Sequence, residues 1–183
     1  MIRKLFLIPF LLLFALFSYG QSVQLVYEQA GISFRGLSVI NNKVAWVSGT
    51  KGTIGKTTDG GKTWEWLKVA GYETTDFRDI EAFDKNTAVI MGIASPGVIL
   101  KTTDGGKNWK KVYENNHSAI FMDAMHFWNE MSGIVIGDPI DGRFFILRSF
   151  NGGETWMELE AADGPVAIEG EACFAASGTN ITA

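Results

Sequence analysis

A nine-residue motif occurs twice in this chain and returns a third time in a looser form. The first two copies read KTTDGGKTW and KTTDGGKNW, and the third reads RSFNGGETW. Asp59, Asp104 and Asn151 hold the same place in the three copies, so the copies are 45 and 47 residues apart. A near-constant period of this length indicates a repeat protein, in which each repeat packs against its neighbours.

Short apolar runs surround each copy of the motif. Three runs precede it in every repeat, and a fourth begins at its Trp. The runs are rich in β-branched and aromatic residues and are separated by Asn, Asp and Gly, a pattern typical of antiparallel strands. No segment after residue 20 has a convincing long helical period. The runs are 37–40, 44–47, 53–56 and 64–67, then 80–83, 88–91, 98–101 and 109–112, then 124–127, 133–136, 144–147 and 156–159.

Four strands in a repeat of roughly 40 to 50 residues predict the blade of a β-propeller. The expected fold class is therefore all-β, with four-stranded antiparallel blades. The motif falls in the hairpin between the third and fourth strands. Its glycines supply positive φ at no steric cost, its Asp accepts turn hydrogen bonds, and its Trp buries a large ring. The residues expected to be structural in this way are Asp59, Trp64, Asp104, Trp109, Asn151 and Trp156.

The three motifs resemble Asp-boxes, the S-x-D-x-G-x-x-W repeats that are also called BNR repeats. Asp-boxes occur in sialidases, xyloglucanases, sortilin-type receptors and propellers similar to photosystem II assembly factors. The sequence K-T-T-D-G-G-K-x-W is most similar to the boxes of that last group and of its secreted bacterial relatives. The third box departs from the pattern with Asn151 in place of Asp. The resemblance implies a β-propeller but no single function, because these families share the box and differ in chemistry.

The N-terminus has the pattern of a secretory signal peptide over residues 1–20. Arg3 and Lys4 give a positive start, an apolar run of 13 residues follows, and small residues precede a cleavage site after Gly20. The run is too short to span a bilayer comfortably. We therefore expect a secreted, periplasmic or cell-surface protein without a membrane span after cleavage, and the alternative is an uncleaved N-terminal anchor.

The repeat divides the remaining chain into five parts. These are an N-terminal outer strand within 21–33, blades at 34–72, 73–118 and 119–165, and the start of a fourth blade at 166–183. Three blades and one strand cannot close a ring. We therefore expect the front part of a truncated ring of about six to eight blades. The missing blades would come from further C-terminal sequence, or from a second chain if the arc closes by dimerising.

Composition excludes several classes of site. The formal net charge of −4 argues against nucleic acid as a partner, because nucleic-acid-binding proteins carry a basic stripe. Cys173 is the only cysteine, which rules out an internal disulfide and favours a small buried residue. His117 and His126 are the only histidines, so a His-rich metal site is excluded. No dinucleotide-binding fingerprint or Cys-x-x-Cys motif is present, and the sequence predicts neither a cofactor nor a metal.

Charged residues recur where the first strand of each blade begins. These starts read FRGL at 34–37, FRDI at 77–80 and FMDA at 121–124, and EGEA at 169–172 aligns with them. The first strand lines the channel of a propeller, so the charges should gather near one mouth, overhung by the connection at 137–143. They either bind a polar ligand or form Arg–Asp pairs that tie blades together. The candidate ligand-binding residues are Arg35, Arg78, Asp79, Asp123, Glu171, Asp138, Asp141 and Arg143.

The functional expectation is a binding or assembly module that recognises a protein or a polar or carbohydrate ligand at the channel mouth. The alternative is a glycoside hydrolase of sialidase or xyloglucanase type. A sialidase resemblance requires three arginines, and Met122 holds the third position. A retaining or inverting glycosidase needs two carboxylates, which Asp79 with Asp123, or Asp138 with Asp141, could supply. Nothing in the sequence selects a catalytic residue.

Overall fold

The computed structural model describes residues 25–160, 163–174 and 181. The predicted signal peptide, residues 1–20, lies outside these described residues. A membrane-spanning helix is not found in the described part of the chain. All regular elements there are strands: β1 (Phe34–Val39), β2 (Ala45–Gly49), β3 (Thr53–Thr57), β4 (Glu65–Lys68), β5 (Phe77–Ala82), β6 (Ala88–Gly92), β7 (Gly97–Thr102), β8 (Lys110–Asn115), β9 (Met122–Phe127), β10 (Gly133–Ile140), β11 (Arg143–Ser149) and β12 (Met157–Glu158).

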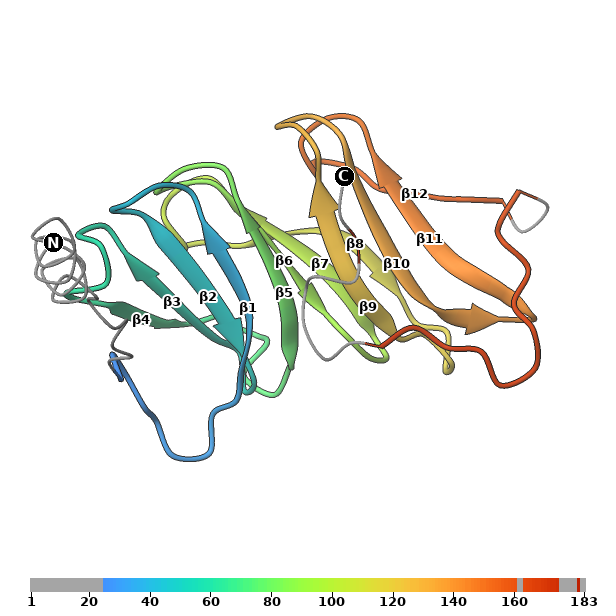
Figure 1. Ribbon diagram of the computed structural model, residues 1–183, viewed down its shortest axis with the longest axis horizontal. Coiled ribbons are helices and arrows are strands. Elements are labelled where there is room, and N and C mark those ends of the chain that lie inside the picture. The colour runs from blue at the N-terminus through green and yellow to red at the C-terminus, as the bar shows by residue number, and fades with distance from the viewer. Residues whose placement is uncertain (1–24, 161–162, 175–180, 182–183) are drawn as a thin grey trace, which may run out of the picture.

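The strands form three four-stranded antiparallel sheets, and each sheet keeps the order of the chain. We name β1 to β4 blade 1, β5 to β8 blade 2, and β9 to β12 blade 3. Figure 1 shows the three blades side by side. The all-β architecture of consecutive four-stranded blades is therefore confirmed. It arises because each repeat contains four short runs with turn residues between them, so every strand pairs with the next one along the chain.

Blade 2 is buried on both faces because it lies between the other two blades. Along β6, Ile90 packs into the core shared with blade 1, whereas Val89 and Met91 pack into the core shared with blade 3. Neighbouring residues of a strand point to opposite faces. A strand covered on both sides is therefore apolar throughout, and all five residues of β6 are buried.

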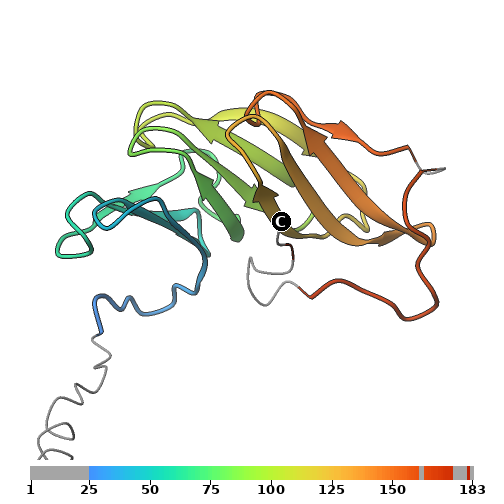
Figure 2. The ribbon, with the colours of Figure 1, turned by 45° about the horizontal axis from the view of Figure 1, so that its top comes forward.

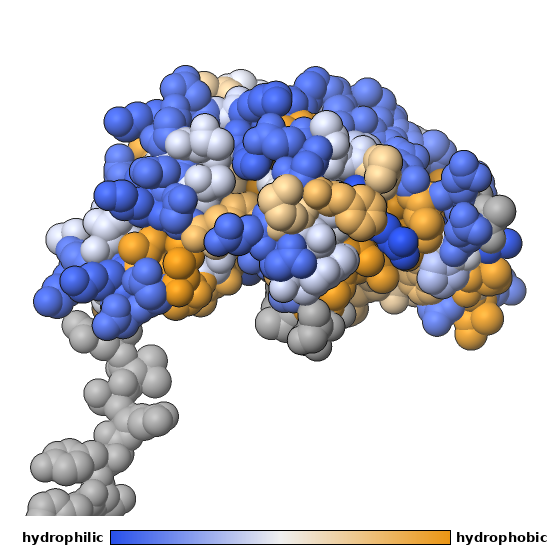
Figure 3. Space-filling view, turned by 90° about the horizontal axis from the view of Figure 1, so that it is seen from above, coloured by the Kyte–Doolittle hydropathy of each residue, from blue (hydrophilic) through white to orange (hydrophobic). Residues whose placement is uncertain are grey.

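The Trp of each box holds an equivalent place in its blade. Trp109 packs against the core between blades 1 and 2, and Trp156 belongs to the core between blades 2 and 3. In blade 1, Trp64 instead lines an open cavity of about 320 Å³ with Leu37 and Val39, which are both 65% exposed. One side of blade 1 therefore presents the kind of apolar surface that the other blades bury. Figure 3 shows hydrophobic surface interrupting the polar surface of the molecule.

The first strands of the blades lie next to one another along the inside of the arc. β1 packs against β5, and β5 packs against β9. Figure 2 shows the resulting curved row of sheets from a second direction. The arrangement brings the beginnings of β1, β5 and β9 to a common edge. The candidate ligand-binding residues Arg35, Arg78 and Asp123 lie at these strand starts.

Backbone hydrogen bonds separate two rims. On the box rim, the turn between the third and fourth strands binds the turn between the first and second: Gly60 N donates to Lys43 O, Gly105 N to Asn86 O and Gly152 N to Met131 O, over 2.8–2.9 Å. On the opposite connection rim, the links between blades meet the hairpins formed by the second and third strands. There Gly52 N donates to Thr75 O and Asp138 N to Phe121 O.

The segments outside the three blades form no strand in their described parts. Residues 25–33 run beside blade 1, where the Tyr27 ring stacks on the Trp66 ring with their centroids 4.0 Å apart. Residues 163–174 return along blade 3, with a single bridge between Val166 and Arg143. The expected outer strand within 21–33 and the expected fourth blade from 166 remain predictions.

Candidate ligand-binding rim

The polar groups of each Asp-box bind the turn of the same box. Asp59 accepts hydrogen bonds from the Thr63 backbone N–H, the Thr63 hydroxyl and the Thr57 hydroxyl over 2.6–2.9 Å. These bonds, first those from Thr63, lower the pKa of Asp59 from 3.8 to about 2. The Thr57 hydroxyl in turn accepts a bond from Gly61 N. The carboxylate of this box therefore closes a hairpin.

The third box makes the same turn with neutral groups. Asn151 Oδ1 accepts hydrogen bonds from Thr155 N and the Ser149 hydroxyl, and Asn151 Nδ2 donates to the Thr155 hydroxyl. Ser149 also accepts a bond from Gly153 N, as Thr57 does from Gly61 N. The replacement of Asp by Asn therefore keeps the hairpin and removes its charge.

The inner strand of every blade begins with a β-bulge on the connection rim. The pairing register shifts around Arg35 in β1, Arg78 in β5 and Asp123 in β9, so each of these residues is the extra one opposite its neighbouring strand. Bulges redirect side chains and are common beside functional sites. Three of the candidate ligand-binding residues therefore occupy the irregular positions of otherwise regular strands.

The two arginines have different surroundings. Arg35 is exposed on β1. The Arg78 side chain is only 13% exposed, and its Nη2 lies 3.4 Å from Asp76 Oδ2, in the link that leads into the same blade. This ion pair joins two residues of one blade rather than two blades. Asp76, which comes two residues before Arg78, was not among the residues singled out in the sequence.

Asp79 lies inside the interface between blades 2 and 3. It is 5% exposed, and its carboxylate accepts hydrogen bonds from Met125 N of blade 3 at 2.8 Å and from Ile80 N at 2.9 Å. Burial raises the pKa of Asp79 from 3.8 to about 7, although both backbone bonds act in the opposite direction. The residue thus ties the two blades together through a backbone amide, and it has little surface to offer a ligand.

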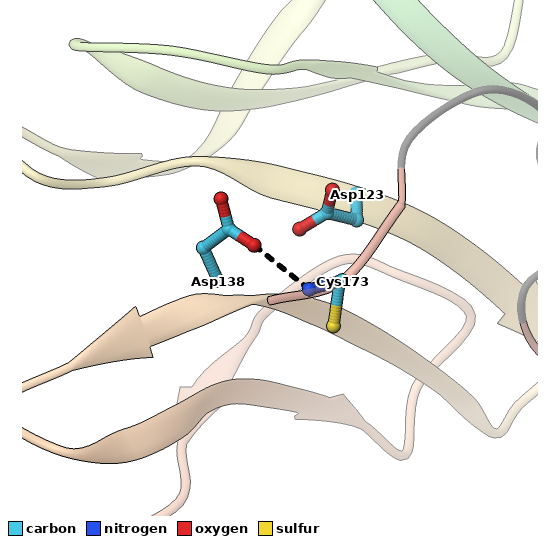
Figure 4. A group of neighbouring side chains, drawn as sticks. All are labelled: Asp123, Asp138 and Cys173. Carbon is cyan, nitrogen blue, oxygen red and sulfur yellow. Dashed lines mark hydrogen bonds between the residues drawn. The ribbon is translucent and has the colours of Figure 1, made fainter. Parts of the chain in front are cut away.

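Asp123, Asp138 and Cys173 come together on the concave side of blade 3. One carboxylate oxygen of each Asp and the Cys sulfur lie within 4.8 Å of one another. Cys173 N donates to Asp138 Oδ1 at 2.9 Å, and in Figure 4 the sulfur points away from the Asp138 carboxylate. Burial, followed by the charges of Asp123 and Asp138, raises the pKa of the Cys173 thiol to about 11. The thiol would have to lose its proton before it could bind a metal ion.

The segment 137–143 is a tight hairpin rather than the long connection expected from the sequence. β10 and β11 pair up to Ile140 and Arg143, leaving only Asp141 and Gly142 in the turn. Both turn residues have positive φ, 52° and 77°. Asp-Gly is a preferred pair for such a two-residue turn. The signal was therefore present in the sequence, but the apolar residues beside it were not read as extensions of the two strands.

The structure therefore divides the candidate residues into separate groups. Asp123 and Asp138 adjoin, Asp141 and Arg143 lie at the hairpin tip, and Glu171 accepts a hydrogen bond from Ile168 N within its own turn. Of the carboxylates considered for a glycosidase, Asp79 and Asp123 are buried, Asp138 is half-buried and Asp141 is exposed. The sequence did not point to Asp76, the partner of Arg78, or to Tyr113 and Asn115, which donate hydrogen bonds to Glu158 between blades 2 and 3. Cys173, expected to be buried, is half-buried.

The chain matches the protein family described as photosynthesis system II assembly factor YCF48 over residues 18–118. This stretch is more than half of the 183 residues. The chain belongs to the YCF48 family. The resemblance to Asp-box propellers of the photosystem II assembly factor type is thereby confirmed. No curated protein sequence gives a significant match.

Solved structures with a similar fold include two of YCF48 and one of a xyloglucanase. YCF48 bound to D1 peptide is 25% identical with a TM-score of 0.53, and YCF48 from Cyanidioschyzon merolae is 23% identical with a TM-score of 0.51. Each covers 68% of this YCF48-family chain, which spans 39% of each of them. A GH74 xyloglucanase from Xanthomonas campestris is 15% identical with a TM-score of 0.48, covering 65% of this chain and 19% of its own. The two YCF48 structures, whose TM-scores exceed 0.5, confirm the predicted β-propeller fold.

Proposed function

We propose that this chain is a binding or assembly module that recognises a segment of a partner protein on its connection rim. The observation that carries the proposal is the similarity to a YCF48 structure that holds a D1 peptide, within a family described as an assembly factor. A peptide is a ligand that an open rim of strands and turns can hold without a deep active-site cleft. A polar or carbohydrate ligand is the other outcome that the sequence left open.

The connection rim is favoured over the box rim by the state of its polar groups. On the box rim, the carboxylates of Asp59 and Asp104 accept hydrogen bonds from groups of their own turns. On the connection rim, the exposed side chains of Arg35 and Asp141 form no hydrogen bond or ion pair with other described residues. Charges that the fold does not need are available for recognition.

The proposed location is outside the cytoplasm, either secreted, periplasmic or at the cell surface. It rests on the signal-peptide pattern of residues 1–20. We expect the mature protein to begin at Gln21, and mass spectrometry of the protein exported from a bacterial host tests this. A mature mass that still includes residues 1–20 would favour the N-terminal anchor instead.

A peptide-display experiment tests the binding function. The probe is a library of random twelve-residue peptides on phage, selected on the exported chain after removal of residues 1–20. Enriched peptides are synthesised and titrated by calorimetry. We expect saturable binding that Arg35→Ala weakens about ten-fold, as the loss of a charged hydrogen bond predicts. Asp59→Ala on the box rim is the matched control and should leave the affinity unchanged.

The outcomes separate the alternatives. Two outcomes would contradict recognition on the connection rim. The selected peptides could bind an unrelated protein equally well, or Asp59→Ala could weaken binding as much as Arg35→Ala does. Saturable binding on a glycan array, together with no peptide enrichment, assigns the module to carbohydrates instead. Hydrolysis of xyloglucan or of a sialoside by the purified chain would replace the binding function with the glycosidase.

A further inference from the structure

One hairpin of blade 3 exceeds its counterparts in the other two blades. β10 and β11 have eight and seven residues, whereas β2 and β3 each have five, and β6 and β7 have five and six. A repeat fold does not require one blade to carry longer strands than its neighbours. The extra length on the connection rim is therefore a feature of this blade alone.

The hairpin forms one wall of a cavity of about 370 Å³. The end of β8 and the residues after it, from blade 2, form another wall, and β12 with Leu159 forms the third. Ile140, Phe145 and Leu159 supply apolar surface. The volume lies within the range of natural ligand pockets, which extends from about 300 to 1,000 Å³. The cavity is thus large enough for one long side chain with some of its main chain.

A carboxylate at the cavity is held in place from blade 2. The Tyr113 hydroxyl and Asn115 Nδ2 both donate to Oε1 of Glu158 on β12. Burial, and then the bond to Glu158, raises the pKa of Tyr113, so this hydroxyl remains a donor. Among the described residues, no hydrogen bond is made to Glu158 Oε2. This second oxygen is therefore fixed in position and available to a ligand.

The remaining charges make the cavity a receptor for a cation. Asp141 is exposed at the hairpin tip and takes part in no hydrogen bond or ion pair with other described residues. Arg143, which also lines the cavity, carries a permanent positive charge. Its Nη1 already donates a hydrogen bond to Gly164 O at 2.6 Å. The lining therefore contains two carboxylates and one guanidinium, and the guanidinium is already hydrogen-bonded to the protein's own backbone. The negative net charge of the chain adds to this preference.

We propose that this cavity binds a peptide segment through a lysine or arginine side chain. The aliphatic part of that side chain packs on Ile140, Phe145 and Leu159, and its cationic end binds Glu158 Oε2. Asp141, at the hairpin tip and therefore at the other end of the cavity, adds negative charge. Long cationic side chains pack their stems on apolar surface in this way, and charge-assisted hydrogen bonds are the stronger class. The proposal rests on the proposed peptide-binding function and names the chemistry of the recognised segment.

The test uses three capped hexapeptides that differ only at one position, with the sequence Ala-Ala-Leu-X-Ala-Gly and X as Lys, Gln or Glu. Each is titrated to millimolar concentration into the 15N-labelled chain, and amide shifts are followed by NMR. We expect the Lys peptide to shift the amides of Asn115, Arg143, Phe145 and Glu158. The Gln peptide should bind about ten-fold more weakly, because it lacks the charge that the carboxylates receive.

Two variants locate the effect. Glu158→Gln keeps an oxygen that can accept the bonds from blade 2, and it should weaken binding of the Lys peptide about ten-fold. Asp141→Asn keeps the turn, because Asn-Gly suits it as well as Asp-Gly does, and should weaken binding several-fold. Glu130→Gln is the control, since Glu130 is an exposed carboxylate of the same blade near the box rim. It should change nothing.

Three results would overturn the proposal: equal binding of the Lys and Gln peptides, tighter binding of the Glu peptide, or equal binding by wild type and both carboxylate variants. If library-selected peptides still bound through Arg35, the proposed peptide-binding function would stand, and only the role of this cavity would be rejected. If neither experiment showed binding, both the proposed peptide-binding function and the role of this cavity would be rejected.

Discussion

Lys56 in β3 donates a hydrogen bond from Nζ to the carbonyl oxygen of Gly105 in the Asp-box of the next blade, over 2.9 Å. Lys101 makes the same bond to Gly152, also over 2.9 Å. The two lysine side chains are only 12% and 10% exposed. The box carbonyl of one blade is therefore a receptor for a cation from the blade before it, and Arg148 holds the corresponding position in blade 3.

The first prediction is that Lys56→Met lowers the free energy of unfolding by about 1.5–3 kcal/mol, the range for a hydrogen bond to a charged group. Met keeps the length and the apolar stem, so the change removes the bond to the buried Gly105 together with the ion pair to Glu65 and the contact with the Trp46 ring. Urea denaturation measures the effect. Lys110→Met is the control because Lys110 is 70% exposed in its pair with Glu154, and it should change stability by less than about 0.5 kcal/mol. Equal effects of the two variants would mean that the bond between blades is not a significant contribution.

The second prediction concerns pH and Asp79. Its pKa is raised by burial to about 7, so the folded state holds this proton more tightly than the unfolded state does. The contribution to stability is complete below about pH 4 and is lost as the pH rises towards 7. Asp79→Asn should therefore stabilise the protein at pH 8 by about 1–2 kcal/mol and have little effect at pH 4. The gain is partial because Asn presents one acceptor oxygen to two backbone donors.

Neighbouring groups decide how this experiment is analysed. Glu81, whose pKa is also raised by burial, lies 3.4 Å from His126 Nδ1 in the same interface, so Glu81 adds its own pH dependence to that of Asp79. The quantity to compare is the difference between wild type and Asp79→Asn across the pH range, measured by urea denaturation. A difference that stays constant from pH 4 to 8 would show that Asp79 ionises normally in the folded protein.

The third prediction compares the boxes at acid pH. Hydrogen bonds within their turns lower the pKa values of Asp59 and Asp104 to about 2. Their contribution is present above about pH 4 and is lost as the pH falls through 2, whereas Asn151 does not titrate. Asp59→Asn copies the third box. We expect it to lower the melting temperature by a few degrees at pH 7 and by less at pH 2. A constant difference would show that the Asp59 charge does not stabilise the turn.

The sequence predicted the blades well because the information for them is local. Each strand is bounded by its own Asn, Asp or Gly turn, and the nine-residue motif, which recurs after 45 and then 47 residues, places Trp64, Trp109 and Trp156 in equivalent positions. The contacts between blades were not predictable in this way. The bond from Met125 N to Asp79 and the bonds to Glu158 depend on the register of strands that are more than 40 residues apart. Charge alone placed Asp79 at the channel mouth, but the bulge beside it turns its carboxylate into the interface.

The last prediction separates backbone strain from packing between blades. Gly106 and Gly142 both have positive φ, 86° and 77°, so an Ala at either position adopts a left-handed conformation at a cost of about 1–2 kcal/mol. Their surroundings differ. A Cβ on Gly106 would lie 3.0 Å from Leu67 and 3.3 Å from Trp46 of blade 1, whereas a Cβ on Gly142 would meet nothing within 4 Å. Gly106→Ala should therefore destabilise the protein by at least about 1 kcal/mol more than Gly142→Ala, since overpacking adds about 1–3 kcal/mol. Urea denaturation of both variants measures this difference, and equal losses would mean that blade 1 yields to the added methyl group and that the box is not tightly packed against it.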